Sequence, residues 1–220
     1  MNSLNQNFSS RVVIDTTKSI WSDSPCLGVR RIYLERDNFS ETAVVSSIVE
    51  YKSQTSFDPH AHSKGEEFFV IEGTFSDEQG DYPAGSYVRN PHGSYHSPFS
   101  KEGCKIFVKL RQFNDSDNKR VVIREHNYNW LPGISKGLSV MPLHSYGTEH
   151  SALVKWDPCT TFSRHSHWGG EEIYILNGVL HDEYGTYKKG TWIRSPHLST
   201  HTPFTSDEGA TIFVKTGHMK

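Results

Sequence analysis

Two stretches of this chain are copies of one another, and the duplication constrains the fold more than any other feature of the sequence. Residues 57–100 and 162–205 align without a gap, with 19 identities in 44 positions. Upstream, Arg11-Val12-Val13-Ile14 returns as Arg120-Val121-Val122-Ile123. A period of roughly one hundred residues is too long for a solenoid repeat and is typical of a duplicated small domain.

The duplication predicts the domain boundaries. We expect residues 1–10, which are polar and rich in Asn and Ser, to form a loose tail. Two domains follow at residues 11–113 and 120–220, and the polar run between them, residues 114–119, is the expected linker.

The local sequence pattern is that of strands throughout both copies. Short β-branched and aromatic runs are separated by clusters of Gly, Pro, Asp and Asn. These runs include residues 43–51, 68–71, 105–110, 173–176 and 211–215. Asp77-Glu78-Gln79-Gly80 and its copy Asp182-Glu183-Tyr184-Gly185 are predicted hairpin turns, and turn chemistry accounts for their carboxylates better than an acid–base pair does. The pattern predicts an all-β chain of two sandwiches or barrels.

Each copy carries two histidines two positions apart, followed four residues later by a glutamate. The two sets are His60, His62 and Glu66, and His165, His167 and Glu171. Side chains alternate between the faces of a strand, so histidines at i and i+2 point the same way, and a glutamate soon after can close over them. A lone histidine is more often an ordinary core residue, but repetition of the whole pattern favours a metal site.

A second block recurs further along each copy. A glycine is followed after five residues by Pro-His and then by another histidine: Gly85, Pro91 and His96 in the first copy, and Gly190, Pro196 and His201 in the second. The two blocks together resemble the two motifs of the cupin superfamily. Gly65-Glu66-Glu67, Tyr82-Pro83-Ala84-Gly85 and Ser94-Tyr95-His96-Ser97-Pro98 are similar, more narrowly, to the cupin-like domain of the anti-sigma factor ChrR.

The resemblance implies two cupin barrels, which are double-stranded β-helices of the jelly-roll type, each with four metal ligands. The implied ligands are His60, His62, Glu66 and His96 in the first domain, and His165, His167, Glu171 and His201 in the second. The sequence departs from the family motifs at Thr55 and Thr160, where the first motif opens with glycine, and at Leu198 in the second motif. These departures affect turn geometry more than ligation.

Three imidazoles and one carboxylate suit a borderline first-row metal rather than calcium or magnesium. We therefore expect one divalent transition metal per domain, zinc or iron first, with manganese and nickel as alternatives. Zinc would close its shell with four ligands and favour a structural or sensing role. Iron, manganese or nickel would keep two positions open for substrate or dioxygen.

Two functions therefore remain open. One is a metal-dependent small-molecule enzyme of the dioxygenase type, because cupins near this group include iron dioxygenases that cleave β-diketones. The other is a non-enzymatic zinc-binding sensor module, because ChrR relatives are described as zinc-binding sensor domains attached to a sigma-factor inhibitor. We do not expect a sigma-factor partner, since the N-terminal helical inhibitor domain has no counterpart in this sequence.

Charge and hydropathy limit which other partners the chain can have. The net charge of −2, without a Lys/Arg-rich run, argues against nucleic-acid binding. No apolar run is long enough to span a bilayer, and the start lacks the pattern of a secretory signal, so we expect a cytoplasmic protein without a membrane partner. The expected ligand is a small molecule, and exposed strand edges are compatible with a homodimer.

Other residues recur around the expected ligands. His92 and His197 are expected to support loops rather than bind metal. Arg89 and Arg194 have two open interpretations, a structural ion pair or an anchor for an anionic substrate. Four aromatic residues near the ligands could line a cavity or pack in the core: Tyr95, Phe99, Trp168 and Phe204.

The loop between the second histidine and the glutamate differs between the copies. It reads Ser63-Lys64-Gly65 in one and Trp168-Gly169-Gly170 in the other. We predict that the two halves bind different small molecules or that only one is catalytic.

Overall fold

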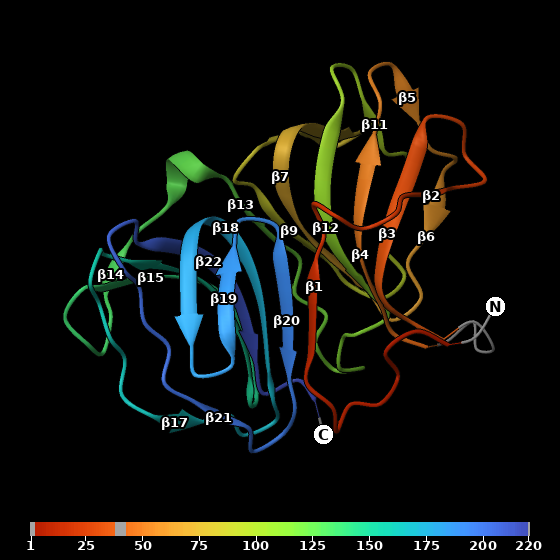
Figure 1. The fold of residues 1–220 in the computed structure, drawn as a ribbon. Coiled ribbons are helices and arrows are strands. Elements are labelled where there is room, and N and C mark those ends of the chain that lie inside the picture. Colours follow the sequence, from red (N-terminus) through yellow and green to blue (C-terminus); the bar gives the residue numbers. More distant parts are fainter. Residues whose placement is uncertain (1–2, 38–42, 220) are drawn as a thin grey trace. The chain divides into compact units, whose positions relative to one another are not determined.

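The structure is a computed structural model that describes residues 3–37 and 43–219. The chain forms two compact units (Figure 1). The first unit comprises Ile20–Tyr128 together with Met1–Gln6, and the second comprises Asn129–Lys220 together with Asn7–Ser19. Within the described residues, no helix is both long and apolar enough to cross a membrane.

The first unit is built on a large antiparallel sheet, in which the strand order is β13-β9-β7-β12-β4-β3-β2. These strands are β2 (Ser22–Asp23), β3 (Val29–Arg36), β4 (Val45–Tyr51), β7 (Glu66–Asp77), β9 (Tyr87–Asn90), β12 (Cys104–Leu110) and β13 (Val121–Ile123). β5 (Thr55–Ser56), β8 (Gly80–Pro83) and β11 (Phe99–Ser100) join it off this path. A separate two-stranded sheet pairs β6 (His60–Ala61) with β10 (Tyr95–His96).

The second unit repeats this arrangement, with the order β1-β20-β18-β22-β16-β15-β14 and with β19 paired to β18. Its strands are β1 (Val12–Asp15), β14 (Leu131–Pro132), β15 (Leu138–Tyr146), β16 (Glu149–Trp156), β18 (Glu171–Asp182), β19 (Gly185–Lys188), β20 (Thr191–Ser195) and β22 (Ala210–Thr216). The small sheet pairs β17 (His165–Ser166) with β21 (Thr200–His201). A single 3-10 turn, η1 (Glu125–Asn127), precedes β14 in the chain.

The all-β prediction is confirmed, and all five predicted runs fall on described strands. The predicted hairpins also form, with Asp77 opposite Gly80 and Asp182 opposite Gly185. The apolar faces of the strands enclose a core in each unit. In the first unit that core contains several aromatic residues, among them Phe68, which is 1% exposed. Burial of these rings is the main stabilising contribution available to a chain with only modest hydrophobic content.

The two units are not the contiguous segments expected from the sequence. Strand β1 pairs with β20 of the second unit, with Val12 opposite Arg194. Strand β13 pairs with β9 of the first unit, with Val121 opposite Arg89. Each Arg-Val-Val-Ile segment therefore completes the sheet of the other copy. A β-branched segment pairs with whichever strand edge is open to it, and sequence spacing does not encode that choice.

The predicted loose tail is also tied down where the structure describes it. Leu4 and Arg36 exchange backbone hydrogen bonds of 2.7 and 3.0 Å. The Asn5 side chain donates to the Leu34 carbonyl at 2.6 Å. Residues 1 and 2 of the predicted tail lie outside the described residues.

Candidate metal centres

Three histidines converge in the first unit. His60 lies opposite His96 across the β6–β10 pair, and His62 follows two residues after His60 on the same face. The ring centroids of His60 lie 5.0 Å from those of both His62 and His96, and the latter two are 4.6 Å apart. The three nitrogen ligand atoms lie within 4.8 Å of one another. The sequence-predicted histidines are therefore brought together.

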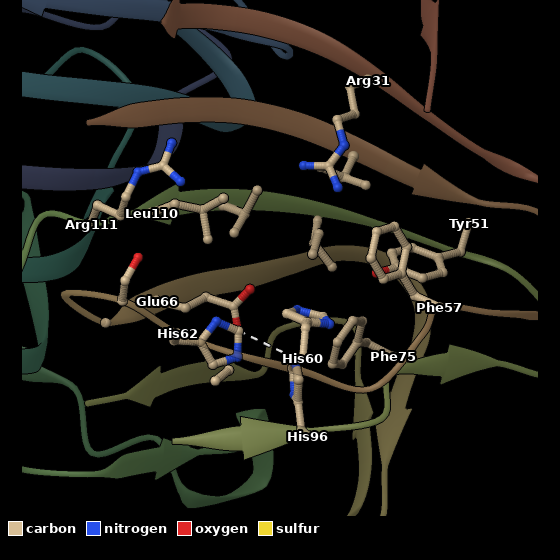
Figure 2. Close-up of a pocket in the computed structure, with 16 residues that line it drawn as sticks. Arg31, Tyr51, Phe57, His60, His62, Glu66, Phe75, His96, Leu110 and Arg111 are labelled. Carbon is tan, nitrogen blue, oxygen red and sulfur yellow. Dashed lines mark ion pairs between the residues drawn. The ribbon is translucent and has the colours of Figure 1, made fainter. Parts of the chain in front are cut away.

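Glu66 stands at the start of β7 and is 6% exposed. Its Oε2 lies 3.4 Å from His62 Nε2 and 3.8 Å from His96 Nε2. It is not part of the group of atoms that all lie within 4.8 Å of one another. The first site thus has three converging imidazoles, with the Glu66 carboxylate beside two of them (Figure 2).

The second unit gathers all four predicted residues. Ligand atoms of His165, His167, Glu171 and His201 all lie within 4.8 Å of one another. Glu171 Oε1 is 3.5 Å from His167 Nε2, and its Oε2 is 3.6 Å from His201 Nε2. Four converging donors of this kind match a tetrahedral zinc shell.

Both clusters bury donor atoms that no protein group satisfies. Among the described residues, Glu171 Oε2 is buried without a hydrogen-bond partner. The same holds for the Nε2 atoms of His62, His96, His167 and His201. Unsatisfied buried polar atoms are costly, and an ion at the centre would remove that cost. The residues present therefore fit a divalent transition metal in each unit.

Burial also holds these groups in particular protonation states. Desolvation lowers the pKa of His62. Desolvation, with the neighbouring His201 and His165, lowers the pKa of His167 to about 3. These imidazoles are neutral at pH 7 and ready to act as ligands. Burial raises the pKa of Glu171 to about 7, although the neighbouring His201 opposes this rise.

Hydrogen bonds orient the Nδ1 nitrogens of the candidate metal-site histidines. His60 Nδ1 lies 2.8 Å from the Asp58 carbonyl oxygen, and His165 Nδ1 lies 3.0 Å from that of Ser163. Such bonds fix the tautomer and turn Nε2 towards the centre.

Asp77 and Asp182 have a role that the sequence interpretation missed. Asp77 Oδ2 lies 3.4 Å from His96 Nδ1, and Asp182 Oδ2 lies 3.4 Å from His201 Nδ1. Asp77 Oδ1 also accepts the Gln79 backbone N–H at 2.8 Å, as turn chemistry predicts. One carboxylate therefore shapes the hairpin and orients a metal-site histidine. In the sequence, the recurrence of both aspartates at matching positions was the feature that could have indicated this role.

His92 and His197 support the loops that precede the glutamates, as predicted. The Lys64 backbone N–H donates to His92 Nδ1 at 3.0 Å, and the Gly169 N–H donates to His197 Nδ1 at 2.9 Å. Their rings are thus engaged outside the two clusters.

Arg89 belongs to a buried ion-pair network rather than to the site. It is fully buried, with Nη1 2.9 Å from Asp117 Oδ2 and Nε 3.5 Å from Glu67 Oε2. Its guanidinium also lies 3.5 Å from the centroid of the Phe113 ring. Of the two open interpretations, the structural ion pair is the one that these contacts support.

A cavity of about 270 Å³ adjoins the first cluster (Figure 2). Its apolar wall includes the aromatic rings of Tyr51, Phe57 and Phe75. Its polar wall includes His60, His62, Glu66 and His96, with two arginines, Arg31 and Arg111. Neither arginine was singled out from the sequence.

The four aromatic residues that could line a cavity or pack in the core, Tyr95, Phe99, Trp168 and Phe204, are not among the residues that line the cavity of the first unit. Tyr95 is 57% exposed and Trp168 is 68% exposed, so neither lines a closed cavity or packs in a core. The pocket beside the second cluster includes His167 and His201, but its other walls are formed by residues such as Arg11, Tyr184 and Leu198. The two sites therefore differ in their surroundings.

Solved structures of several other proteins share this fold. A proposed dioxygenase from Nostoc punctiforme superposes with a TM-score of 0.79 at 16% identity, covering 94% of this chain and 82% of that one. Protein Ylba from E. coli gives 0.74 at 15% identity, covering 97% and 93%. An oxalate decarboxylase from Lactobacillus farciminis gives 0.68 at 13% identity, covering 96% and 87%. Identities this low show the fold alone.

Sequence comparison gives the family. A search of curated proteins finds no match. The family model for the ChrR cupin-like domain matches twice, over residues 9–114 and 118–220. These two matches cover nearly the whole chain and coincide with the two copies. The chain belongs to the ChrR cupin-like domain family, as a protein with two cupin domains.

Proposed function

We propose that this protein is a metal-dependent small-molecule enzyme whose reactive site is the His60–His62–His96 cluster of the first unit. The observation that carries the proposal is the cavity of about 270 Å³ that opens onto these histidines. His60, His62 and His96, with Glu66 beside them, would hold the metal, and an ion that takes six ligands would keep positions open for substrate. Bound iron would activate both dioxygen and the substrate. Solved barrels of this fold include a proposed dioxygenase and an oxalate decarboxylase.

The chain's own residues divide the remaining work. Asp77 orients His96, and the Asp58 carbonyl orients His60. Tyr51, Phe57 and Phe75 give the cavity an apolar wall that limits water around a bound substrate.

The test is oxygen uptake by protein loaded anaerobically with iron(II). A panel of β-diketones and small keto acids is added and oxygen consumption is followed with an electrode. The proposal predicts metal-dependent uptake with at least one substrate, and chelation abolishes it. Absence of turnover across the panel, with iron(II) shown to be bound, contradicts the enzymatic function.

A second function rests on the second unit. Its four donors converge within 4.8 Å, which suits a closed zinc shell with a structural or sensing role. If this is the function of the whole chain, removing zinc alters conformation or partner binding without any catalytic change. Proteolysis and circular dichroism of the zinc-loaded and zinc-free protein measure that response.

A further inference from the structure

Arg31 presents a charged group to the cavity, and none of the described residues forms an ion pair with it. It extends from β3 towards the histidine cluster and lines the cavity (Figure 2). Its guanidinium lies 5.9 Å from the centroid of the Phe57 ring. Among the residues that the structure describes, its side chain has neither a hydrogen bond nor an ion pair. A half-buried guanidinium in this state is poised for an anion.

The adjacent arginine in the same strand shows the contrast. Arg30 points to the other face of β3, where it pairs with Glu50 and stacks over the Trp21 ring at 4.6 Å. Glu50 of β4 thus provides a carboxylate partner for the arginine outside the cavity, whereas no described residue pairs with the arginine inside it.

The second copy lacks both arginines of the cavity. Arg31 lies opposite Val49, and the residue that holds this register in the second unit, opposite Val154, is Val140. Arg111 follows β12 as Gly217 follows β22, and both amides donate to the loop glycine before the glutamate. An arginine at the positions of Arg31 and Arg111 is therefore a property of one copy. The arginine beside the second cluster, Arg11, is instead paired with Asp182 at 2.9 Å.

Arg111 also occupies an unfavourable backbone position. Its φ is +62°, in the left-handed region where the other copy has Gly217 at +75°. Its Nε donates to the Ala43 carbonyl at 2.6 Å, which fixes the guanidinium at the edge of the cavity. An arginine retained in a backbone conformation that favours glycine supports a functional role for its positive charge.

The charge of Arg31 therefore favours an anion in the cavity. Among the described residues it has no carboxylate partner, and the carboxylate that lines the cavity, Glu66, lies beside His62 and His96. The volume of about 270 Å³ lies just under the roughly 300–1,000 Å³ of drug-sized ligand pockets, so the ligand has few carbon atoms.

Building on the proposed function, we propose that the first unit takes a small carboxylate substrate and that Arg31 binds its carboxylate. The planar guanidinium donates two parallel hydrogen bonds to the carboxylate oxygens. The rest of the substrate lies along the wall formed by Phe57 and Phe75, with its second polar group facing the histidines. The second unit, with Val140 at this position, does not bind such anions.

The experiment compares two probes of nearly equal size, acetoacetate and acetylacetone, which differ in a carboxylate against a neutral ketone. Each is titrated calorimetrically into full-length protein loaded anaerobically with iron(II). The variants are Arg31→Leu, Arg31→Lys and the control Arg30→Leu, which removes the same charge from the other face of β3. Iron content and melting temperature are measured for each.

We expect wild type to bind acetoacetate more tightly than acetylacetone. Arg31→Leu should weaken acetoacetate by about tenfold or more, as expected for a lost charge-assisted pair. Arg31→Lys should restore part of this loss, and Arg30→Leu should match wild type. Acetylacetone affinity, iron content and melting temperature should stay unchanged in Arg31→Leu.

Three outcomes overturn the proposal: no acetoacetate binding by wild type, equal affinity in Arg31→Leu, or parallel loss of both probes with a lower melting temperature. The last would assign Arg31 a structural role over Phe57. These measurements need no turnover. Arg31-dependent binding without oxygen uptake would refute the enzymatic function while leaving the carboxylate site intact.

Discussion

Replacing His62 with alanine should abolish metal-dependent turnover, whereas replacing His167 should leave most of it. His62 is 5% exposed, and its Nε2 is buried without a hydrogen bond from any described residue. Loss of this ligand should release the metal beside the cavity. We expect a fall in kcat/KM of about a thousandfold, because metal activation contributes several kcal/mol to the barrier.

His167 holds the matching position in the second site, whose surroundings differ. His167→Ala should therefore reduce kcat/KM by less than about threefold at saturating iron. Such a reduction corresponds to a few tenths of a kcal/mol in the activation barrier, as expected for an indirect effect. Steady-state kinetics on both variants measure the difference. His126→Ala is the control, since that histidine is exposed and lies in the first unit outside the cluster. Equal losses in the two ligand variants would contradict a reactive site confined to the first unit.

Replacing Arg89 with leucine should lower the free energy of unfolding by about 3–5 kcal/mol, the usual effect of removing one partner from a buried ion pair. The change leaves Glu67 and Asp117, which are 1% and 3% exposed, as buried carboxylates without their guanidinium. Urea unfolding of the metal-free protein, followed by fluorescence, measures the effect.

Arg30→Leu is the matched control for this substitution. The Arg30 side chain is 37% exposed, so its pair with Glu50 contributes about 0–1 kcal/mol. An Arg89→Leu variant as stable as wild type, but with weakened binding of acetoacetate, would instead make Arg89 the anion anchor.

The metal-site residues could be found from the sequence because their geometry is local. Strand alternation places His60 and His62 on one face whatever the rest of the chain does. His96 required the family resemblance, because its approach to His60 depends on the pairing of β6 with β10 across 35 intervening residues. The duplication supplied an independent check on each assignment.

The features that the sequence could not predict depend on tertiary register or on differences between the copies. Recurrence drew attention to Arg89, which proved structural, and away from Arg31, whose counterpart is Val140. The exchange of β1 and β13 was invisible because equal repeats are compatible with either partner edge. Asp77 was assigned to its turn alone, since contact with His96 arises only when the hairpin folds over the small sheet.

Metal content per chain tests the central claim most directly. Protein purified from its own host, and the His62→Ala and His167→Ala variants, are analysed by mass spectrometry of the bound elements. The two-site account predicts two equivalents of divalent transition metal in wild type and one in each variant. Wild type with no stoichiometric metal, or either variant losing both equivalents, would contradict it.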